Sequence, residues 1–471
     1  MDRSSQDIDL ESLGSTDSAQ HQQVPERAVS RTDTNTDEAA LEEFEPSILE
    51  RAVDSIWGRF SSCDGSGQVT HPDRGWRPWC IILSCHLIFM NTCGWVNSSG
   101  VFQMYYTENT SLPAGKISWV GSIGAYFLFF VGALTSCLVY ANTVRWIFSI
   151  GIILQFFGLI LTSVCREYWQ YLLAQGVLIG LGHGLIFCPA LAVLSTDFAT
   201  RRPLEIGFAA CGSVMGGTMF SGIVRLLLPN LGYEWTLVVV SSVKLVTLVL
   251  ALILVKPKAK PCQSHPIIGF AMFKDTEYIM FVVASFFTTM GVHIAYYFLA
   301  LYSRTAFNAP LSSEKSLYLL VIFNGIGIVG YFATFVASHV YGIINVSTLV
   351  TLAASLFIYF WIAVQNSVGL YVWSAFYGIV AAAVQSLLST GASSFTEGQD
   401  RRGVRASVTF MIASIAALTG PSIADAIIEL QGGYMGAQVF GGSVTLLGFA
   451  ILAAAKIRWM KRTSVGWLEK I

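Results

Sequence analysis

Residues Gln175–Gly217 read QGVLIGLGHGLIFCPALAVLSTDFATRRPLEIGFAACGSVMGG, and this stretch decides the class of fold. Its first apolar segment carries glycines four residues apart from Gly176 on, and its second carries Gly212 and Gly216. Small residues at this spacing let two helix backbones approach closely, which is how helices pack in lipid. The stretch therefore predicts two neighbouring membrane-spanning helices.

A short polar turn containing Arg201 and Arg202 separates the two apolar segments. Connections on the cytosolic side of a membrane carry an excess of Lys and Arg. The turn is therefore expected in the cytosol, which fixes the orientation of both helices.

The composition of the whole chain agrees with a membrane protein. Of its 471 residues, 54% are hydrophobic and only 12% are charged, and the mean hydropathy is +0.59. Soluble domains are about 25% charged, so lipid is the expected solvent. The formal net charge of -1 indicates no nucleic-acid partner. The nine cysteines show no CxxC or zinc spacing, so we interpret them as small packing residues and expect no metal.

Apolar runs long enough to span a bilayer recur after Arg77. They predict an all-α membrane protein with twelve transmembrane helices in two six-helix halves. The expected helices lie near residues 77–104, 117–139, 144–164, 169–197, 204–228, 233–255, 278–303, 314–337, 346–364, 369–395, 404–428 and 436–456.

The expected domains follow from these spans. Residues 1–72 are polar and poor in aromatics, and we expect a disordered cytosolic tail with no cleaved signal peptide. Residues 73–255 form the N-terminal half, 256–277 a basic cytosolic linker, 278–458 the C-terminal half and 459–471 a second cytosolic tail.

The distribution of Lys and Arg supports this topology, with both termini in the cytosol. The expected location is the cell membrane, with the vacuolar membrane as an alternative. Asn109-Thr110-Ser111 fits a glycosylation sequon and lies in the first loop predicted outside. Asn109 is therefore a candidate glycosylation site.

The pattern of motifs resembles the major facilitator superfamily, and within it the fungal branch of the monocarboxylate-transporter-like family. The first motif, Asp73-Arg74-Gly75-Trp76, precedes the first span, and Gly100-Val101-Phe102 closes that span. The second motif runs from Phe198 through Arg201, Arg202 and Gly207 to Gly212. Asn324-Gly325 and Gly420-Pro421 agree more loosely in the second half. The family motif residues assigned here are Asp73, Gly75, Trp76, Arg201, Arg202, Gly207 and Gly212.

The resemblance implies secondary transport by alternating access, often of a carboxylate together with a proton. This chain departs from the family at the charges that serve lactate in the animal carriers. It has Asn324 and Tyr331 in the eighth span, and Asn97 near the position of the first-span lysine. A small anionic monocarboxylate is therefore disfavoured as substrate.

Ionisable residues inside the spans are candidates for function, because burying them in lipid is costly. Lys244 could meet a polar cavity, or it could snorkel or pair within the bundle. Asp425 could relay protons or support packing. His86, His183 and His293 could each carry a coupling proton or serve as packing residues. No cofactor beyond such proton coupling is expected.

The substrate site is expected near the midplane between the halves, with aromatic and amide side chains suited to a bulky, partly apolar molecule. The candidate substrate-binding residues are Asn97, Tyr126, His183, Phe187, His293, Tyr297, Asn324 and Gln385.

The favoured function is a secondary active transporter of a small organic molecule, a secondary metabolite or a monocarboxylate-like compound, that works by export. An uptake carrier for a nutrient or vitamin is the alternative within the family. A non-transporting receptor or sensor is the alternative from another class. An enzyme is disfavoured, because the sequence shows no paired carboxylates at depth and no nucleophile beside a base. The expected partners are the substrate and the lipid bilayer, and the chain is expected to be a monomer.

Overall fold

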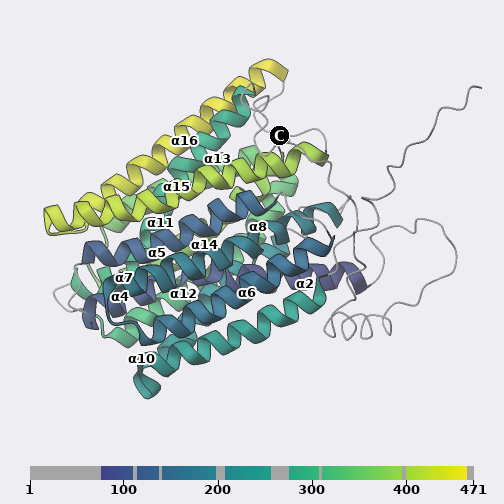
Figure 1. Ribbon diagram of the computed structural model, residues 1–471. Coiled ribbons are helices and arrows are strands. Elements are labelled where there is room, and N and C mark those ends of the chain that lie inside the picture. Colours follow the sequence, from purple (N-terminus) through teal and green to yellow (C-terminus); the bar gives the residue numbers. More distant parts are fainter. Residues whose placement is uncertain are drawn as a thin grey trace, which may run out of the picture. The chain divides into compact units, whose positions relative to one another are not determined.

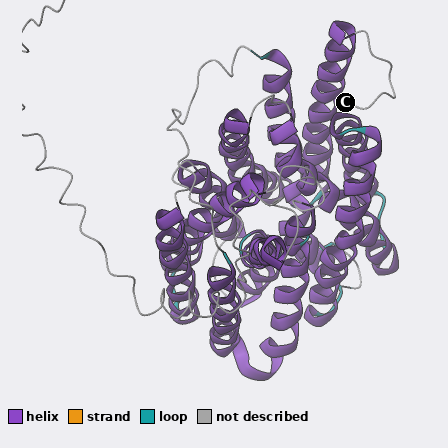
Figure 2. Cartoon of the chain, turned by 90° about the vertical axis from the view of Figure 1, so that its right-hand side faces the viewer, coloured by secondary structure: helices purple, strands orange, loops and turns teal. Residues whose placement is uncertain are grey.

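The computed structural model describes residues 76–109, 114–136, 141–197, 207–255, 275–306, 310–394 and 399–463. These residues form long helices that run side by side (Figure 1), and Figure 2 views the bundle from one end. Eleven helices are long and apolar enough to cross a membrane within the described residues. The expectation of an all-α membrane protein is confirmed.

The first pass through the bundle is broken into three helices. These are α2 (Trp76–Asn91), α3 (Cys93–Asn97) and α4 (Ser99–Asn109). The backbone is distorted at Thr92, whose ψ angle is -78°, and leaves helical geometry at Ser98, whose ψ angle is 4°. The hydroxyl of Ser98 donates to the carbonyl of Trp95 at 2.7 Å. The sequence predicted one continuous helix here, and the short α3 is a structural finding.

The next two passes are α5 (Ala114–Thr135) and α6 (Ala141–Val164). The fourth pass contains α7 (Tyr168–Tyr171), the π-helix η2 (Leu172–Leu178) and α8 (Ile179–Asp197). A capping box between Glu167 and Gln170 starts the pass. A π-helix closes its hydrogen bonds over five residues and so holds more residues per turn than an α-helix.

The fifth and sixth passes share the long helix α10 (Gly212–Leu254), and the span that contains them begins at Gly207. The sequence predicted two separate helices, and the structure joins them through a turn at Gly232, which has a φ of 74°. Only glycine adopts such a backbone at little cost. Because the span from Gly207 to Leu254 contains two passes, the eleven spans found among the described residues make twelve passes.

The remaining six passes are single helices. They are α11 (Thr276–Thr305), α12 (Ser313–Tyr341), α13 (Ile343–Ile362), α14 (Ser367–Ser394), α15 (Gln399–Gln431) and α16 (Met435–Thr463). We refer to α2 through α10 as the first half and to α11 through α16 as the second half.

Glycines bring helices of the first half into backbone contact, as the sequence predicts. A Cβ atom on Gly216 would overlap the carbonyl of Met90 in α2, and one on Gly94 would lie 2.6 Å from the Cα of Gly216. On the fourth pass, a Cβ on Gly180 would lie 3.1 Å from the Cα of Gly124 in α5. Close backbone contact through small residues therefore packs α10 on the first pass and α8 on α5.

Three pairs of helices make the most extensive contacts between the two halves. They are α5 with α15, α10 with α12, and α4 with α11. We name the two ends of the bundle after residues at these contacts. The Glu108 end is where α4 and α11 finish. The Ser136 end is where α5 finishes and α15 begins, and Ser136 is the residue directly after α5. Side chains buried between these helices form the candidate site.

Candidate substrate site between the two halves

A cavity lies between the halves. It measures about 50 Å³, counting the positions that the centre of a water molecule can occupy, which is room for roughly three to five waters. Its lining residues are Phe89, Cys93, Val96, Asn97, Leu128, Phe129, Phe187, Ala210, Ser213, His293, Tyr331, Gln385, Leu388 and Phe410. None of these described lining residues is Asp, Glu, Lys or Arg. The cavity is apolar with a few placed polar groups, as small-molecule sites usually are.

Two amides connect the halves at this cavity. The Nδ2 of Asn97 on α3 donates to the Oε1 of Gln385 on α14 at 3.2 Å. The Nε2 of Gln385 donates back to the Oδ1 of Asn97 at 2.9 Å. Asn97 Nδ2 also lies 3.4 Å from the carbonyl of Ser213. Both amides were predicted as substrate-binding residues, and the structure brings them together.

A second polar contact crosses the cavity between the halves. The hydroxyl groups of Ser213 on α10 and Tyr331 on α12 lie 2.8 Å apart. Both side chains are buried. Sequence reasoning noted Tyr331 only as a missing charge and did not select Ser213, because one hydroxyl in an apolar run carries no distinguishing signal.

His293 contributes the only imidazole among the described lining residues. Its Nδ1 lies 2.8 Å from the carbonyl oxygen of Thr289, so Nδ1 must be the donor. In the neutral ring this leaves Nε2 as a hydrogen-bond acceptor. The cavity wall therefore offers donors and acceptors without a fixed charge.

Three phenylalanines form the wall toward the Ser136 end. The rings of Phe129 on α5 and Phe410 on α15 are stacked, and Phe187 on α8 packs edge-on against both. Beyond these rings, the hydroxyls of Ser136 and Ser407 lie 2.6 Å apart. The two halves therefore meet at this end through aromatic and hydroxyl contacts. Phe187 was predicted from sequence, and the other two rings were missed, since many phenylalanines in the chain face lipid or the core.

Ion pairs hold the halves together at the Glu108 end. Arg304 on α11 forms a salt bridge and hydrogen bond with Glu108 on α4. Arg225 on α10 pairs with Glu314 on α12 at 2.9 Å, and its guanidinium lies over the ring of Tyr318. Both pairs cross between the halves, so the cavity is closed toward this end as well.

The other predicted substrate-binding residues lie outside the cavity lining. Tyr126 is half-buried and stacks on Phe130. Tyr297 is fully buried, and its ring lies against Gly121 of α5. Asn324 is 1% exposed, and its amide lies against Gly217, close to the Cβ of Asn97.

His183 lies in the interior of the first half rather than in the cavity lining. Its Nε2 is 3.1 Å from the Nζ of Lys244, and Lys244 is 1% exposed. The ammonium also lies 4.7 Å from the centre of the Trp95 ring. Of the alternatives weighed for Lys244, the structure therefore shows pairing within the bundle.

The other ionisable candidates are also buried in contacts. His86 Nδ1 lies 3.1 Å from the carbonyl of Phe208. Asp425 on α15 is 3% exposed and lies next to Ser118 of α5. Ser118 in turn accepts from Gln103 at 2.8 Å. Of these contacts, the one between Asp425 and Ser118 joins the halves, and the other two lie within the first half.

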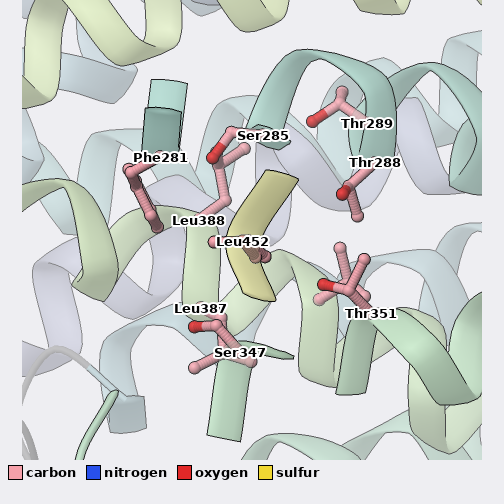
Figure 3. Close-up of a pocket in the computed structure, with 10 residues that line it drawn as sticks. Phe281, Ser285, Thr288, Thr289, Ser347, Thr351, Leu387, Leu388 and Leu452 are labelled. Carbon is pink, nitrogen blue, oxygen red and sulfur yellow. The ribbon is translucent and has the colours of Figure 1, made fainter. Parts of the chain in front are cut away.

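A smaller cavity of about 30 Å³ lies within the second half. Figure 3 shows Ser285, Thr288 and Thr289 along α11, with Ser347 and Thr351 of α13 on another side and Leu452 between them. Leu388 lines both this cavity and the larger one. The smaller cavity has room for roughly two or three waters, so the larger cavity is the candidate substrate site.

Several predicted motif residues lie outside the described residues, namely Asp73, Gly75, Arg201 and Arg202. Trp76 begins α2. Gly207 begins the fifth pass and contacts Phe335 of α12, while a Cβ on Gly212 would overlap the carbonyl of His86. Asn109 ends α4 and is exposed, so its glycosylation remains a prediction.

The arrangement defines a class of protein. Twelve apolar passes enclose a cavity between two halves, and contacts between those halves close the cavity at both ends. Such a site can bind a small molecule near the midplane and change its access by rocking one half against the other. The fold and the site together define a secondary membrane transporter.

Comparison with known proteins gives the family. The family model described as Major Facilitator Superfamily matches residues 85–421, and the chain belongs to this superfamily. An MFS-type transporter of Gibberella zeae is 38% identical over 394 residues, covering 83% of this chain and 89% of that protein.

Other similar proteins carry names that mention a product. The aspyridones efflux protein of Emericella nidulans is 27% identical and covers 82% of this chain and 79% of its own length. The fujikurins efflux protein of Gibberella fujikuroi is 28% identical, and the match covers 83% of this chain and 85% of that protein. Among solved structures, the nucleoside transporter NupG superposes with a TM-score of 0.60 at 13% identity over 81% of this chain and 99% of that one, which supports the fold alone.

Proposed function

We propose that this transporter exports a bulky, uncharged and mostly apolar organic molecule of the secondary-metabolite type. The two six-helix halves, residues 73–255 and 278–458, would rock around the cavity at Asn97 and Gln385. The observation that carries this proposal is the chemistry of the cavity wall, which is aromatic and amide with no charged side chain among its described members. Names of relatives that mention efflux support the direction.

Within the superfamily, we place the chain in the fungal monocarboxylate-transporter-like branch. Its first-half motifs support this placement. The cavity that the structure describes has Asn97 and Tyr331 where a carrier of small carboxylates would need charge. The chain would therefore use the architecture of that branch for a different class of substrate.

We further propose a cell-membrane location for a monomer with both termini in the cytosol. The distribution of Lys and Arg supports this topology. The Ser136 end would then face the cytosol, and the Glu108 end would face outward. Access from the cytosol would require separation of Phe129 and Phe410, and release outward would require separation of Glu108 and Arg304.

Transport into inside-out plasma-membrane vesicles tests this proposal. Vesicles containing the chain are incubated with a metabolite extract from the fungus that carries the gene, and their contents are compared by mass spectrometry with vesicles lacking the chain. We expect at least one uncharged aromatic or polycyclic compound to be enriched in the inside-out vesicles. Right-side-out vesicles provide the control for direction.

Three results would count against the proposal. Enrichment only in right-side-out vesicles would indicate uptake, and enrichment only of small carboxylates would contradict the substrate class. No enrichment in either orientation would favour a receptor or sensor.

A further inference from the structure

The amide pair at the cavity is reciprocal, which distinguishes it from a single hydrogen bond. Asn97 and Gln385 each donate one hydrogen bond and accept one, at 3.2 and 2.9 Å. Each amide therefore presents a donor next to an acceptor to its partner. A molecule with a neighbouring N–H (or O–H) and C=O on one edge would present the same pattern to either residue.

The pair lies between elements that separate in the transport cycle. Asn97 is on α3 of the first half and Gln385 is on α14 of the second. Asn97 is 2% exposed, so its Oδ1 would lose the hydrogen bond from Gln385 in an apolar surrounding when the halves move apart, and its Nδ2 would keep only the 3.4 Å contact with the carbonyl of Ser213. A buried polar group left without a partner carries a large desolvation cost. A ligand that supplies the matching donor and acceptor removes this cost.

A further buried acceptor lies beside the pair. The Oδ1 of Asn324 has no hydrogen-bond partner among the described residues, although the side chain is 1% exposed. It lies against Gly217, where the Cβ of Asn97 also lies close. Buried polar atoms are nearly always bonded, so an unpaired acceptor lies next to Asn97, although Asn324 itself is not among the lining residues of the cavity.

The residues around the amide pair determine the polarity and charge that the rest of the ligand can have. The rings of Phe129, Phe187 and Phe410 and the side chains of Val96, Leu128 and Leu388 make up the apolar wall. Lys244 is held in the interior of the first half by His183 and Trp95 and does not line the cavity. An ionised ligand would find no counter-charge among the described lining residues, and burying its charge would be costly.

We infer that the Asn97–Gln385 pair is an interdomain latch that the substrate replaces, and that the substrate is an uncharged, flat, largely apolar molecule with a donor next to an acceptor on one edge, as in a lactam. This inference rests on the proposed function and names the chemical group that the site recognises. The empty latch holds the halves together, and the ligand releases it by taking over its hydrogen bonds. Recognition and opening are then one event.

A matched pair of probes tests the inference on the purified full chain in nanodiscs. 2-Quinolone carries a lactam N–H next to its C=O, and N-methyl-2-quinolone lacks only the donor. Quinoline-2-carboxylate is an anion of similar shape. We expect 2-quinolone to bind at least about tenfold more tightly than the N-methyl analogue, as expected for a buried acceptor left unpaired, and more tightly than the carboxylate.

Variants connect the preference to the latch. In Q385L, and independently in N97L, the preference for 2-quinolone over its N-methyl analogue should fall to less than about twofold. Q155L is the matched control, because Gln155 is also fully buried and lies against Gly182 outside the cavity. Q155L should keep the full preference, which separates recognition from a general effect of losing a buried amide.

Equal binding of the two quinolones by the wild type would overturn the inference. So would tighter binding of the carboxylate, no binding of 2-quinolone up to its solubility limit, or a preference that survives in both Q385L and N97L. These failures differ from failure of the proposed function. Vesicles that accumulate a metabolite while the quinolones bind equally would refute the latch alone, whereas a quinolone preference without transport in either orientation would refute export alone.

Discussion

The ring of Phe410 lies stacked on the ring of Phe129, with centroids 5.6 Å apart and planes 9° from parallel. One ring belongs to α15 and the other to α5, so the contact joins the halves. Offset stacking of aromatic rings contributes about 0.5–1.5 kcal/mol beyond the area that it buries. Phe129 and Phe410 therefore form a wall of the cavity that must part before anything enters from the Ser136 end.

Replacing Phe410 by alanine should open that wall. Cys93 lines the cavity and serves as a natural reporter. We expect N-ethylmaleimide to modify Cys93 several-fold faster in F410A than in the wild type, because the stacked ring no longer blocks access. Peptide mass spectrometry over a time course measures the rate. F157A is the control, since Phe157 is 55% exposed on another helix. An unchanged rate of modification at Cys93 in F410A would show that the Phe410 ring does not restrict access.

Linking the halves at the Ser136 end should stop transport. The hydroxyls of Ser136 and Ser407 are 2.6 Å apart, close enough for cysteines at both positions to form a disulfide. We expect oxidised S136C/S407C to lose transport in the vesicle assay and to regain it after reduction. Each single cysteine variant should be insensitive to oxidant. Full transport by completely cross-linked protein would contradict rocking of the halves at this end.

Reversing the charges at the Glu108 end should shift the balance between closed and open states. The Glu108 and Arg304 side chains are each 27% exposed, so we assign the pair only about 1 kcal/mol, or about a fivefold shift. Spin labels on Asn109 and Leu430 should show more of the long-distance population in E108R and in R304E. The double variant E108R/R304E restores an ion pair and should restore the wild-type distribution. A double variant that resembles the singles would indicate that local packing, not charge, holds this end.

Gly216 should tolerate no side chain, whereas Gly222 on the same helix should. A Cβ on Gly216 would overlap the Met90 carbonyl, but nothing lies within 4 Å of a Cβ on Gly222. We expect G216A to be destabilised by about 1–3 kcal/mol, as for other overpacked sites, and G222A to be unchanged or slightly more stable. Thermal unfolding of the two proteins in the same detergent gives the comparison. Equal unfolding temperatures would mean that the first pass can move away from α10 at little cost.

Lys244 should be dispensable for folding although it is buried. Its Nζ contacts His183 Nε2 at 3.1 Å and the Trp95 ring, and no carboxylate pairs with it among the described residues. Methionine has a similar length without the ammonium, so K244M should unfold at the same temperature as the wild type or higher. Thermal unfolding with H183Q as the companion variant measures this. A clearly lower unfolding temperature for K244M would show that the ammonium contributes to stability through its contacts with His183 and Trp95.

The sequence predicted the helices well because lipid imposes a simple rule on composition. Length and apolar content located the spans. Glycine spacing correctly indicated that α10 and α8 each pack on another helix by backbone contact, α10 on the first pass and α8 on α5. The break at Ser98 and the join at Gly232 were not predictable from hydropathy, since both depend on local backbone geometry inside continuous apolar sequence.

The candidate site was harder to predict, because one-dimensional spacing does not tell which face of a helix meets the other half. Asn97, Phe187, His293 and Gln385 were selected by residue type and expected depth, and they line the cavity. His183 is one helical turn before Phe187 on the same helix, yet it contacts Lys244. Ser213 and Phe410 were missed because their importance comes from their partners across the cavity, 118 residues away in the case of the Ser213–Tyr331 contact.

The π-helix η2 determines how sensitive the fourth pass is to changes of length. One residue more or less in an α-helix turns everything after it by about 100°, and η2 accommodates its extra residue within Leu172–Leu178. Deleting a single residue there would remove the extra residue and let the segment close as an ordinary α-helix. Gly180 would then keep its contact with α5, His183 its contact with Lys244, and Phe187 its place at the cavity. A single in-frame codon deletion in this segment should therefore be less damaging than the same deletion within α8, where no wider turn absorbs the change.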